Sequence, residues 1–185
     1  PPLLLTPEYI FPAEAAAFAA LRAAEGRQPV PLHVFLSLDG DLPAEATVFT
    51  EPTIPLLIAT TTRGVAAARA VVANRPGAIV RDFGTESVDP VALMAALRHE
   101  YGVASLLFEG GPRAYGSLLQ ADQLDDEFLT LSPIMIGNHP PGAGRHRPSL
   151  VEGVAFAPGA APQQRLISLR RAGEHLFLRS RYLHR

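Results

Sequence analysis

The sequence contains no cysteine, which excludes disulfides, thiolate nucleophiles and cysteine-ligated metals. Lysine is absent as well, so all 16 side chains of the Lys and Arg class are arginine. This excludes Schiff-base chemistry and the P-loop lysine, because each needs a primary amine. Any phosphate must therefore be bound by arginine, hydroxyl groups, backbone N–H groups or a helix end.

Long apolar runs and strong net charge are also missing. No run approaches the roughly 20 residues needed to span a bilayer, and no charged segment precedes a signal-like apolar core. A net charge of −2 in 185 residues gives neither a nucleic-acid footprint nor a polybasic membrane patch. We therefore expect a cytoplasmic protein with no nucleic-acid or membrane partner. The length and the apolar share of 48% suit one domain with a sizeable core.

The most informative segment is residues 104–137, ASLLFEGGPRAYGSLLQADQLDDEFLTLSPIMIG. It opens with an apolar run, Ala104–Phe108, short enough for a strand buried on both faces. Gly110 and Gly111 follow, and Pro112 suits the first turn of a helix. Such a junction predicts an anion site, because the helix start offers N–H groups and glycine lets a phosphate approach the main chain. A glycine turn needed only for close packing gives the same pattern, so both interpretations stay open.

A second apolar run, Phe128–Ile136, follows the acidic residues DDE. It contains Pro133, which cannot donate to a ladder and places this expected strand at an edge or a bulge. The order of apolar strand, EGGP, helix, DDE and LTLSPIMIG resembles the reductase domain of the bacterial riboflavin-biosynthesis pyrimidine reductases, from about residue 7 to 185. The resemblance implies a dihydrofolate-reductase-like α/β fold: a mostly parallel sheet flanked by helices, with a C-terminal antiparallel hairpin.

The resemblance also implies a chemistry. It indicates NADPH as the cofactor and direct hydride transfer to a small aminouracil-like or pteridine-like heterocycle, or to its ribosyl-derived imine. The implied reaction is that of a 5-amino-6-(5-phosphoribosylamino)uracil reductase. The cofactor would supply the hydride, and the protein would position it and adjust the field around it.

Three threonines and an arginine follow the expected strand Pro55–Ala59. Ligands in open α/β sheets bind outside the carboxyl ends of strands, so this position suits a ligand. Thr62 as a helix cap with a solvated Arg63 is the alternative, and one residue can serve both roles. The resemblance implies that the turn holds the adenosine 2′-phosphate of NADPH, with Arg63 as its cation.

The remaining pattern alternates strands and helices. From residue 55 onward the expected order is β, α, β, α, β, α, β, which with short connections predicts a mostly parallel sheet. The last two strands flank the turn Ala172–Glu174 and form a hairpin. We expect strands at Leu32–Leu38, Pro55–Ala59, Ala78–Val80, Ala104–Phe108, Phe128–Ile136, Gln164–Arg171 and Leu176–Tyr182, and helices at Ala13–Glu25, Val65–Ala73, Asp89–Glu100 and after Pro112.

Several other motifs carry less weight. The tetrapeptide SLDG at residues 37–40 resembles a substrate-side motif of the family, but its spacing favours Asp39 as a turn residue with no chemical role. His139 and His146 have no carboxylate beside them, so we expect no metal site. GAGR is too short for a dinucleotide fingerprint. The arginines near the C-terminus favour a solvated face over a nucleic-acid surface: Arg165, Arg170, Arg171, Arg179 and Arg181.

We expect a single reductase-like domain over residues 1–185, acting as a homodimer. The family's first strand, helix and second strand are not found, so we expect the natural polypeptide to extend upstream of Pro1, or a partner chain to take that place. Glu109 is the expected polar group on the substrate side, and its alternative is a carboxylate that bonds nearby N–H groups. A non-catalytic nucleotide-binding or structural dimer of the same fold is the alternative function. The expected cofactor-binding residues are Thr60, Thr61, Thr62, Arg63, Gly110, Gly111, Pro112, Arg113 and Ala114.

Overall fold

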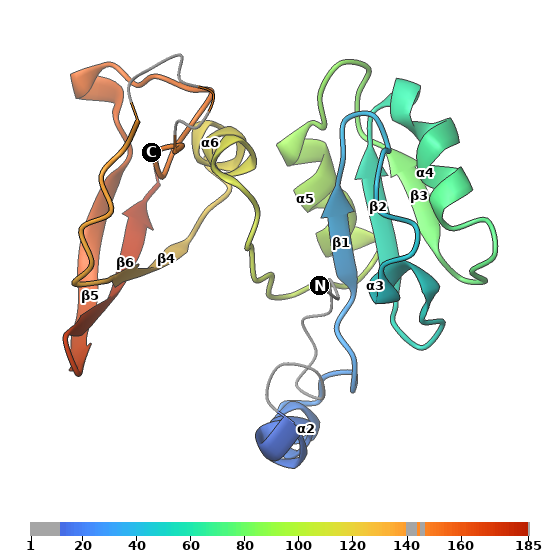
Figure 1. Ribbon diagram of the computed structural model, residues 1–185, viewed down its shortest axis with the longest axis horizontal. Coiled ribbons are helices and arrows are strands. Elements are labelled where there is room, and N and C mark those ends of the chain that lie inside the picture. Colours follow the sequence, from blue (N-terminus) through green and yellow to red (C-terminus); the bar gives the residue numbers. More distant parts are fainter. Residues whose placement is uncertain (1–11, 140–143, 145–146, 185) are drawn as a thin grey trace. The chain divides into compact units, whose positions relative to one another are not determined.

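The computed structural model describes residues 12–139, 144 and 147–184, and the chain divides into two compact units, Pro1–Leu93 and Met94–Arg185 (Figure 1). Each unit has its own sheet. Within the described residues, no helix combines the length and apolar character needed to cross a membrane. The single domain expected from the sequence stays a prediction.

The first unit is built on a parallel sheet in the order β1-β2-β3. Its strands are β1 (His33–Leu36), β2 (Leu56–Thr60) and β3 (Ile79–Asp82). All five residues of the central strand β2 are buried, which is typical of a parallel strand covered on both faces. The three strands expected in this part of the chain are confirmed, each with slightly different bounds.

Helices precede and follow these strands along the chain, and in Figure 1 the first of them lies apart from the sheet. They are α2 (Ala15–Ala24), which continues the 3-10 turn η1 (Pro12–Glu14); α3 (Thr47–Thr50); α4 (Val65–Val71), which continues η2 (Thr62–Gly64); and α5 (Pro90–His99). Asp89 begins α5 as the sequence predicts, since its Oδ1 accepts the N–H groups of Val91 at 2.9 Å and Ala92 at 3.2 Å. The boundary between the two units falls within α5.

The core of the first unit encloses a charged side chain, Arg75, which is 6% exposed. Its guanidinium donates to the backbone carbonyls of Val48 and Ile54, two residues of the apolar core. Burial lowers the pKa of Arg75 from its usual value. The two carbonyls therefore depend on this arginine for hydrogen bonding in a place that water does not reach.

The second unit contains α6 (Pro112–Gln120) and an antiparallel sheet in the order β4-β6-β5. The strands are β4 (Asp126–Leu131), β5 (Gln163–Ala172) and β6 (His175–Leu183), and the short turn η3 (Pro158–Ala160) precedes β5. Strands β5 and β6 pair from Gln163↔Leu183 to Ala172↔His175, with a bulge between Leu166 and Ser168. This confirms the expected C-terminal hairpin.

Two expected strands differ from the structure. Residues 104–108 form no strand, and Leu107 is 77% exposed, so the prediction of a buried parallel strand at Ala104–Phe108 is wrong. An apolar run indicates a tendency to be buried, but it does not specify the neighbouring strand that a ladder needs. The expected strand Phe128–Ile136 is shorter, since β4 starts at Asp126 and ends at Leu131, before Pro133.

Polar side chains link α6 to this sheet. The Tyr115 hydroxyl donates to Glu127 and lies 2.6 Å from the Tyr182 hydroxyl, while Gln164 Nε2 donates to Glu127 Oε2 at 2.8 Å. Burial, then the contacts with Glu127 and Tyr182, raise the pKa of Tyr115, so its phenol stays protonated. This network holds α6 against the sheet, and the first turn of α6 lines a surface groove.

Three arginines of the hairpin, Arg171, Arg179 and Arg181, have carboxylate partners. Arg181 Nε donates to Asp126 Oδ1 at 2.7 Å and Arg179 Nε donates to Asp126 Oδ2 at 3.0 Å. The hydrogen bonds from Arg181 and then Arg179 hold the pKa of Asp126 well below its usual range. Arg171 Nη2 pairs with Glu174 at 2.6 Å. These pairs make part of the hairpin surface salt-bridged, and the expected lack of a nucleic-acid partner stays a prediction.

Candidate functional site

Three turns meet where the parallel strands of the first unit end. They are 37–41 after β1, 60–64 after β2 and 82–84 after β3, and the parallel register brings them to one edge (Figure 1). Thr62 N donates to the Gly84 carbonyl at 2.8 Å, and Phe83 N donates to the Thr60 carbonyl at 3.0 Å. The turn that the sequence predicts as a phosphate site is therefore hydrogen-bonded to the turn after β3.

Two glycines let the first two turns pack closely. A Cβ on Gly64 would lie 2.1 Å from Thr60 Oγ1 and 2.9 Å from the Leu38 oxygen. Gly40 has φ +74°, and a Cβ there would lie 2.2 Å from the Gly64 oxygen. Close approach thus requires glycine at both positions.

The carboxylate of Asp39 forms hydrogen bonds within the turn at 37–41. Its Oδ1 accepts the Asp41 N–H at 3.2 Å and the Ser37 hydroxyl at 3.0 Å. The Asp41 N–H and then the Ser37 hydroxyl hold the pKa of Asp39 below its usual value. The arrangement agrees with the interpretation of Asp39 as a turn residue.

The four expected residues of the turn divide into a buried pair and an exposed pair. Thr60 and Thr61 are fully buried. Thr60 Oγ1 has no hydrogen-bond partner in the described part of the chain, and Thr61 Oγ1 donates to the Leu38 oxygen at 2.5 Å. Thr62 and Arg63 are exposed. The side chains able to meet a ligand at this edge are therefore those of Thr62 and Arg63.

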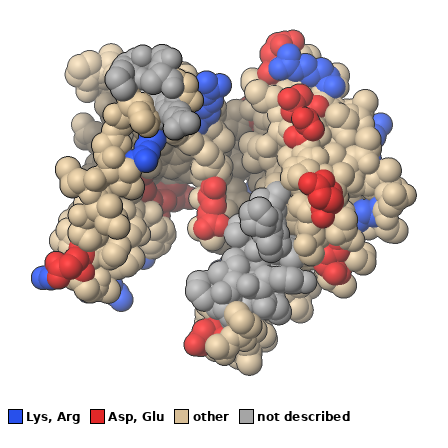
Figure 2. Space-filling model, viewed as in Figure 1, with Lys and Arg blue, Asp and Glu red and all other residues tan. Residues whose placement is uncertain are grey.

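Carboxylates that sequence reasoning did not single out lie beside this exposed pair. Thr62 Oγ1 donates to Asp82 Oδ2 at 3.0 Å, and Arg63 Nη1 lies 3.4 Å from Glu86 Oε2. Figure 2 shows acidic and basic side chains gathered at the end of this unit where β1 and β2 finish in Figure 1. A sequence signal existed for Asp82, because it ends the strand next to β2 and so must reach the same edge.

In the second unit, four expected residues line one groove of about 550 Å³. The first turn of α6 forms one wall, and the loop that carries Pro148 and Glu152 forms the other. The lining residues are Gly111, Pro112, Arg113, Ala114, Pro148 and Glu152. The structure therefore brings the glycine turn, a helix start and a guanidinium to one surface depression.

The wall opposite α6 is held by specific bonds. Glu152 N donates to the Pro112 carbonyl at 3.1 Å, and Glu152 Oε1 accepts the Ser149 N–H at 2.7 Å and its hydroxyl at 2.8 Å. Gly116 permits this close approach of the loop to α6, since a Cβ there would lie 2.4 Å from the backbone oxygen of Glu152. The pattern S-x-x-E at residues 149–152 was a signal for this loop, because such pairs bond reciprocally at turns and helix starts.

The groove has the features of an anion site. The first turn of the nine-residue helix α6 presents N–H groups that lack intrahelical acceptors, and Arg113 adds a cation. A Cβ on Gly111 would meet nothing within 4 Å, so there is open space beside this backbone for a phosphate. At Gly110 a Cβ would lie 2.4 Å from the Phe108 ring, so that glycine accommodates the aromatic side chain.

Glu109 is exposed and follows an irregular segment instead of the expected strand.

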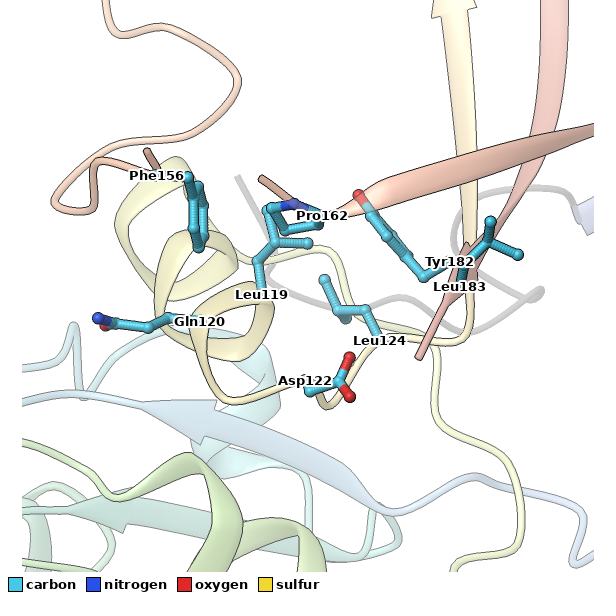
Figure 3. A pocket seen from close by; sticks show the side chains of 8 residues that line it. All are labelled: Leu119, Gln120, Asp122, Leu124, Phe156, Pro162, Tyr182 and Leu183. Carbon is cyan, nitrogen blue, oxygen red and sulfur yellow. The ribbon is translucent and has the colours of Figure 1, made fainter. Parts of the chain in front are cut away.

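A smaller cavity of about 170 Å³ lies at the other end of α6 (Figure 3). Leu119, Leu124 and Phe156 make it largely apolar. Its Asp122 carboxylate lies 3.0 Å from His184 Nδ1, and the Tyr182 hydroxyl is engaged with Tyr115. Asp122 and Tyr182 thus have partners inside the unit, and sequence reasoning did not identify this cavity.

No cluster of three or more metal-ligating side chains occurs in the parts of the chain that the structure describes. His139 is exposed, and His146 lies outside the described residues, as does most of the GAGR segment. The sequence-based expectation about metals stays a prediction.

Comparisons with known proteins identify a family and several similar structures. A family model described as the RibD C-terminal domain matches residues 12–176. A pyrimidine reductase-like protein from Corynebacterium diphtheriae aligns with a TM-score of 0.73 at 19% identity, covering 91% of this chain and 68% of that chain. RibD from Acinetobacter baumannii aligns with a TM-score of 0.61 at 17% identity, covering 81% of this chain and 37% of that chain. None of the curated proteins matches this chain.

The name of a similar Thermotoga maritima protein gives two activities, a deaminase and a reductase. This diaminohydroxyphosphoribosylaminopyrimidine deaminase/5-amino-6-(5-phosphoribosylamino)uracil reductase aligns with a TM-score of 0.54 at 18% identity, covering 83% of this chain. The chain spans 37% of the length of the A. baumannii protein and 38% of the T. maritima protein. Structural similarity at these identities shows the shared fold alone.

Proposed function

Since the chain belongs to the RibD C-terminal domain family, we propose that it is an NADPH-dependent reductase of a small heterocycle. Its fold is the dihydrofolate-reductase-like α/β fold of that family. The observation that carries the proposal is the groove over the first turn of α6, where Gly111, Pro112, Arg113 and Ala114 all lie. The substrate class is the phosphoribosylaminouracil named for the T. maritima protein.

In this proposal each turn has its own task. The first turn of α6 binds the pyrophosphate through N–H groups and the Arg113 guanidinium. The turn at 60–63 binds the adenosine 2′-phosphate through Arg63 and the Thr62 hydroxyl. When bound, the dihydronicotinamide would supply a hydride to the substrate's imine carbon, and a proton would complete the reduction at nitrogen. Glu109 is the polar group on the substrate side.

The experiment is a turnover assay that follows dihydronicotinamide absorbance with an aminouracil or a pteridine substrate. We expect one cofactor oxidised for each substrate molecule reduced. Cofactor binding without oxidation by any substrate would instead support the non-catalytic nucleotide-binding dimer. The proposal keeps the cytoplasmic location and the homodimer expected from the sequence.

A first prediction concerns Arg63. A charge-assisted hydrogen bond is worth on the order of 1.5 to 3 kcal/mol, so Arg63→Ala should weaken NADPH binding about tenfold to a hundredfold. NADH, which lacks the 2′-phosphate, should bind almost as before. Calorimetric titration of both cofactors measures the difference.

The matched control is Arg69→Ala, which removes the same charge from an exposed position further along α4. This variant should bind both cofactors like the parent protein. Equal losses for NADPH and NADH in Arg63→Ala would contradict the assignment of the 2′-phosphate to this residue.

A further inference from the structure

The turn at 60–64 has few donors left for a phosphate. The Thr61 hydroxyl donates to the Leu38 oxygen, and the Thr62 backbone N–H donates to the Gly84 carbonyl. The Gly64 N–H donates to the Thr61 carbonyl at 2.9 Å, and Thr60 Oγ1 is fully buried. Among the side chains of this turn, a 2′-phosphate therefore depends on the Thr62 hydroxyl and the Arg63 guanidinium.

Carboxylates engage both of these remaining groups. The Thr62 hydroxyl donates to Asp82 Oδ2 at 3.0 Å, and Arg63 Nη1 lies 3.4 Å from Glu86 Oε2. Asp39 adds a third negative charge that interacts with Arg63. Asp82 and Glu86 thus lie beside the Thr62–Arg63 pair and Asp39 adds to the negative charge around it, whereas a phosphate-binding turn would normally be positive.

The backbone fixes Asp82 and Glu86 in these places. Asp82 is the last residue of β3 and pairs in register with Thr60. Glu86 is carried by a tight loop, because Gly84 has φ +146° and a Cβ there would lie 2.3 Å from the Ser87 oxygen. Residues 83–89 are further closed by the bond from Asp89 N to the Phe83 carbonyl at 2.8 Å.

We propose that Asp82 and Glu86 determine cofactor specificity at this edge, opposing the 2′-phosphate of NADPH while the 2′-hydroxyl of NADH donates to Asp82. A carboxylate at the end of a neighbouring parallel strand is well placed to accept a ribose hydroxyl, and the same charge repels a phosphate. The proposal rests on the proposed function, since it concerns the same cofactor. It predicts that the parent protein binds NADPH at most about tenfold more tightly than NADH.

The test compares NADPH and NADH titrations of the full chain for the parent protein, Asp82→Asn, Glu86→Gln and the double variant. Each neutral amide keeps the size of the side chain and removes one negative charge. We expect NADPH to bind about fivefold more tightly in each single variant and about twentyfold more tightly in the double variant. Asp82→Asn should leave NADH binding unchanged or weaken it.

Glu45→Gln is the matched control, because it removes one exposed negative charge from a loop before α3. It should leave both affinities unchanged. The gain in NADPH affinity should also shrink as salt rises from about 0.05 to 0.5 M, as expected for a charge effect and not for a structural change. Melting temperatures of the variants show that the fold is retained.

Other outcomes separate the two proposals. If NADPH and NADH bind but their ratio stays the same in the double variant, the specificity proposal is overturned and the reductase proposal stands. A parent protein that prefers NADPH by a hundredfold or more, with no change in the variants, also overturns it. If neither cofactor binds the parent protein or any variant, both proposals fail.

Discussion

Gly64→Val is expected to lower the free energy of unfolding of the first unit by about 3 kcal/mol or more, since overpacking by smaller changes already costs about 1 to 3. Gly64 is buried, and a Cβ there would lie 2.1 Å from Thr60 Oγ1 and 2.9 Å from both the Leu38 oxygen and the Asp39 carbonyl carbon. The Leu38 oxygen accepts the Thr61 hydroxyl, so it cannot move without losing that bond. Urea denaturation followed by circular dichroism measures the loss.

The control is Ala67→Val, which adds carbon atoms to an exposed position on α4 close to Gly64. This change should cost only a few tenths of a kcal/mol, through helix propensity. A denaturation midpoint for Gly64→Val equal to that of the control would show that the turns at 37–41 and 60–64 do not pack as described. A large difference would show that the SLDG segment is part of this packing.

The first unit was largely predictable because its signals were local. Apolar runs of strand length, separated by helical segments with short connections, leave few arrangements other than a parallel sheet. The start of α5 was marked by Asp89 and Pro90, and the side-chain bonds from Asp89 show why. The hairpin of the second unit was equally predictable from the sequence, because two segments of alternating apolar and polar residues flank Gly173. This glycine has φ +57° and makes the tight turn between the two strands.

Residues 104–108 could not be assigned from their pattern. A strand forms only where another strand offers a ladder, and that partner is remote in sequence. An apolar run contains no information about it. The same pattern is therefore compatible with the buried strand that we expected and with the exposed, irregular segment that the structure has.

The glycines of the candidate site could be predicted from the sequence, whereas the carboxylates beside the 60–63 turn were less predictable. The pair Gly110–Gly111 before Pro112 marks the start of α6 in the sequence itself. Asp82 and Glu86 reach the 60–63 turn only through the register of β2 with β3, and they lie about 20 residues away along the chain. Burial of Thr60 and Thr61 was also hidden, because β2 is covered on both faces and has no polar alternation.

Gly111→Val is expected to abolish cofactor binding while the second unit stays folded. Gly111 has φ −71° and ψ 170°, which valine can adopt, and a Cβ there would meet nothing within 4 Å. The loss of stability should be about 1 kcal/mol or less, from the poorer residue at the N-cap of α6. The added methyl groups would occupy the space in which a pyrophosphate must approach the backbone.

Gly116→Ala is the matched variant, because this glycine of the same helix does have a packing role. Its Cβ would lie 2.4 Å from the Glu152 oxygen, so stability and cofactor binding should fall together as the loop is displaced from α6. A melting curve and a cofactor titration of each variant separate the two behaviours. If Gly111→Val unfolds at ambient temperature, as Gly116→Ala would be more prone to do, the glycine pair serves packing. If it stays folded and still binds the cofactor, the pyrophosphate does not lie at this turn.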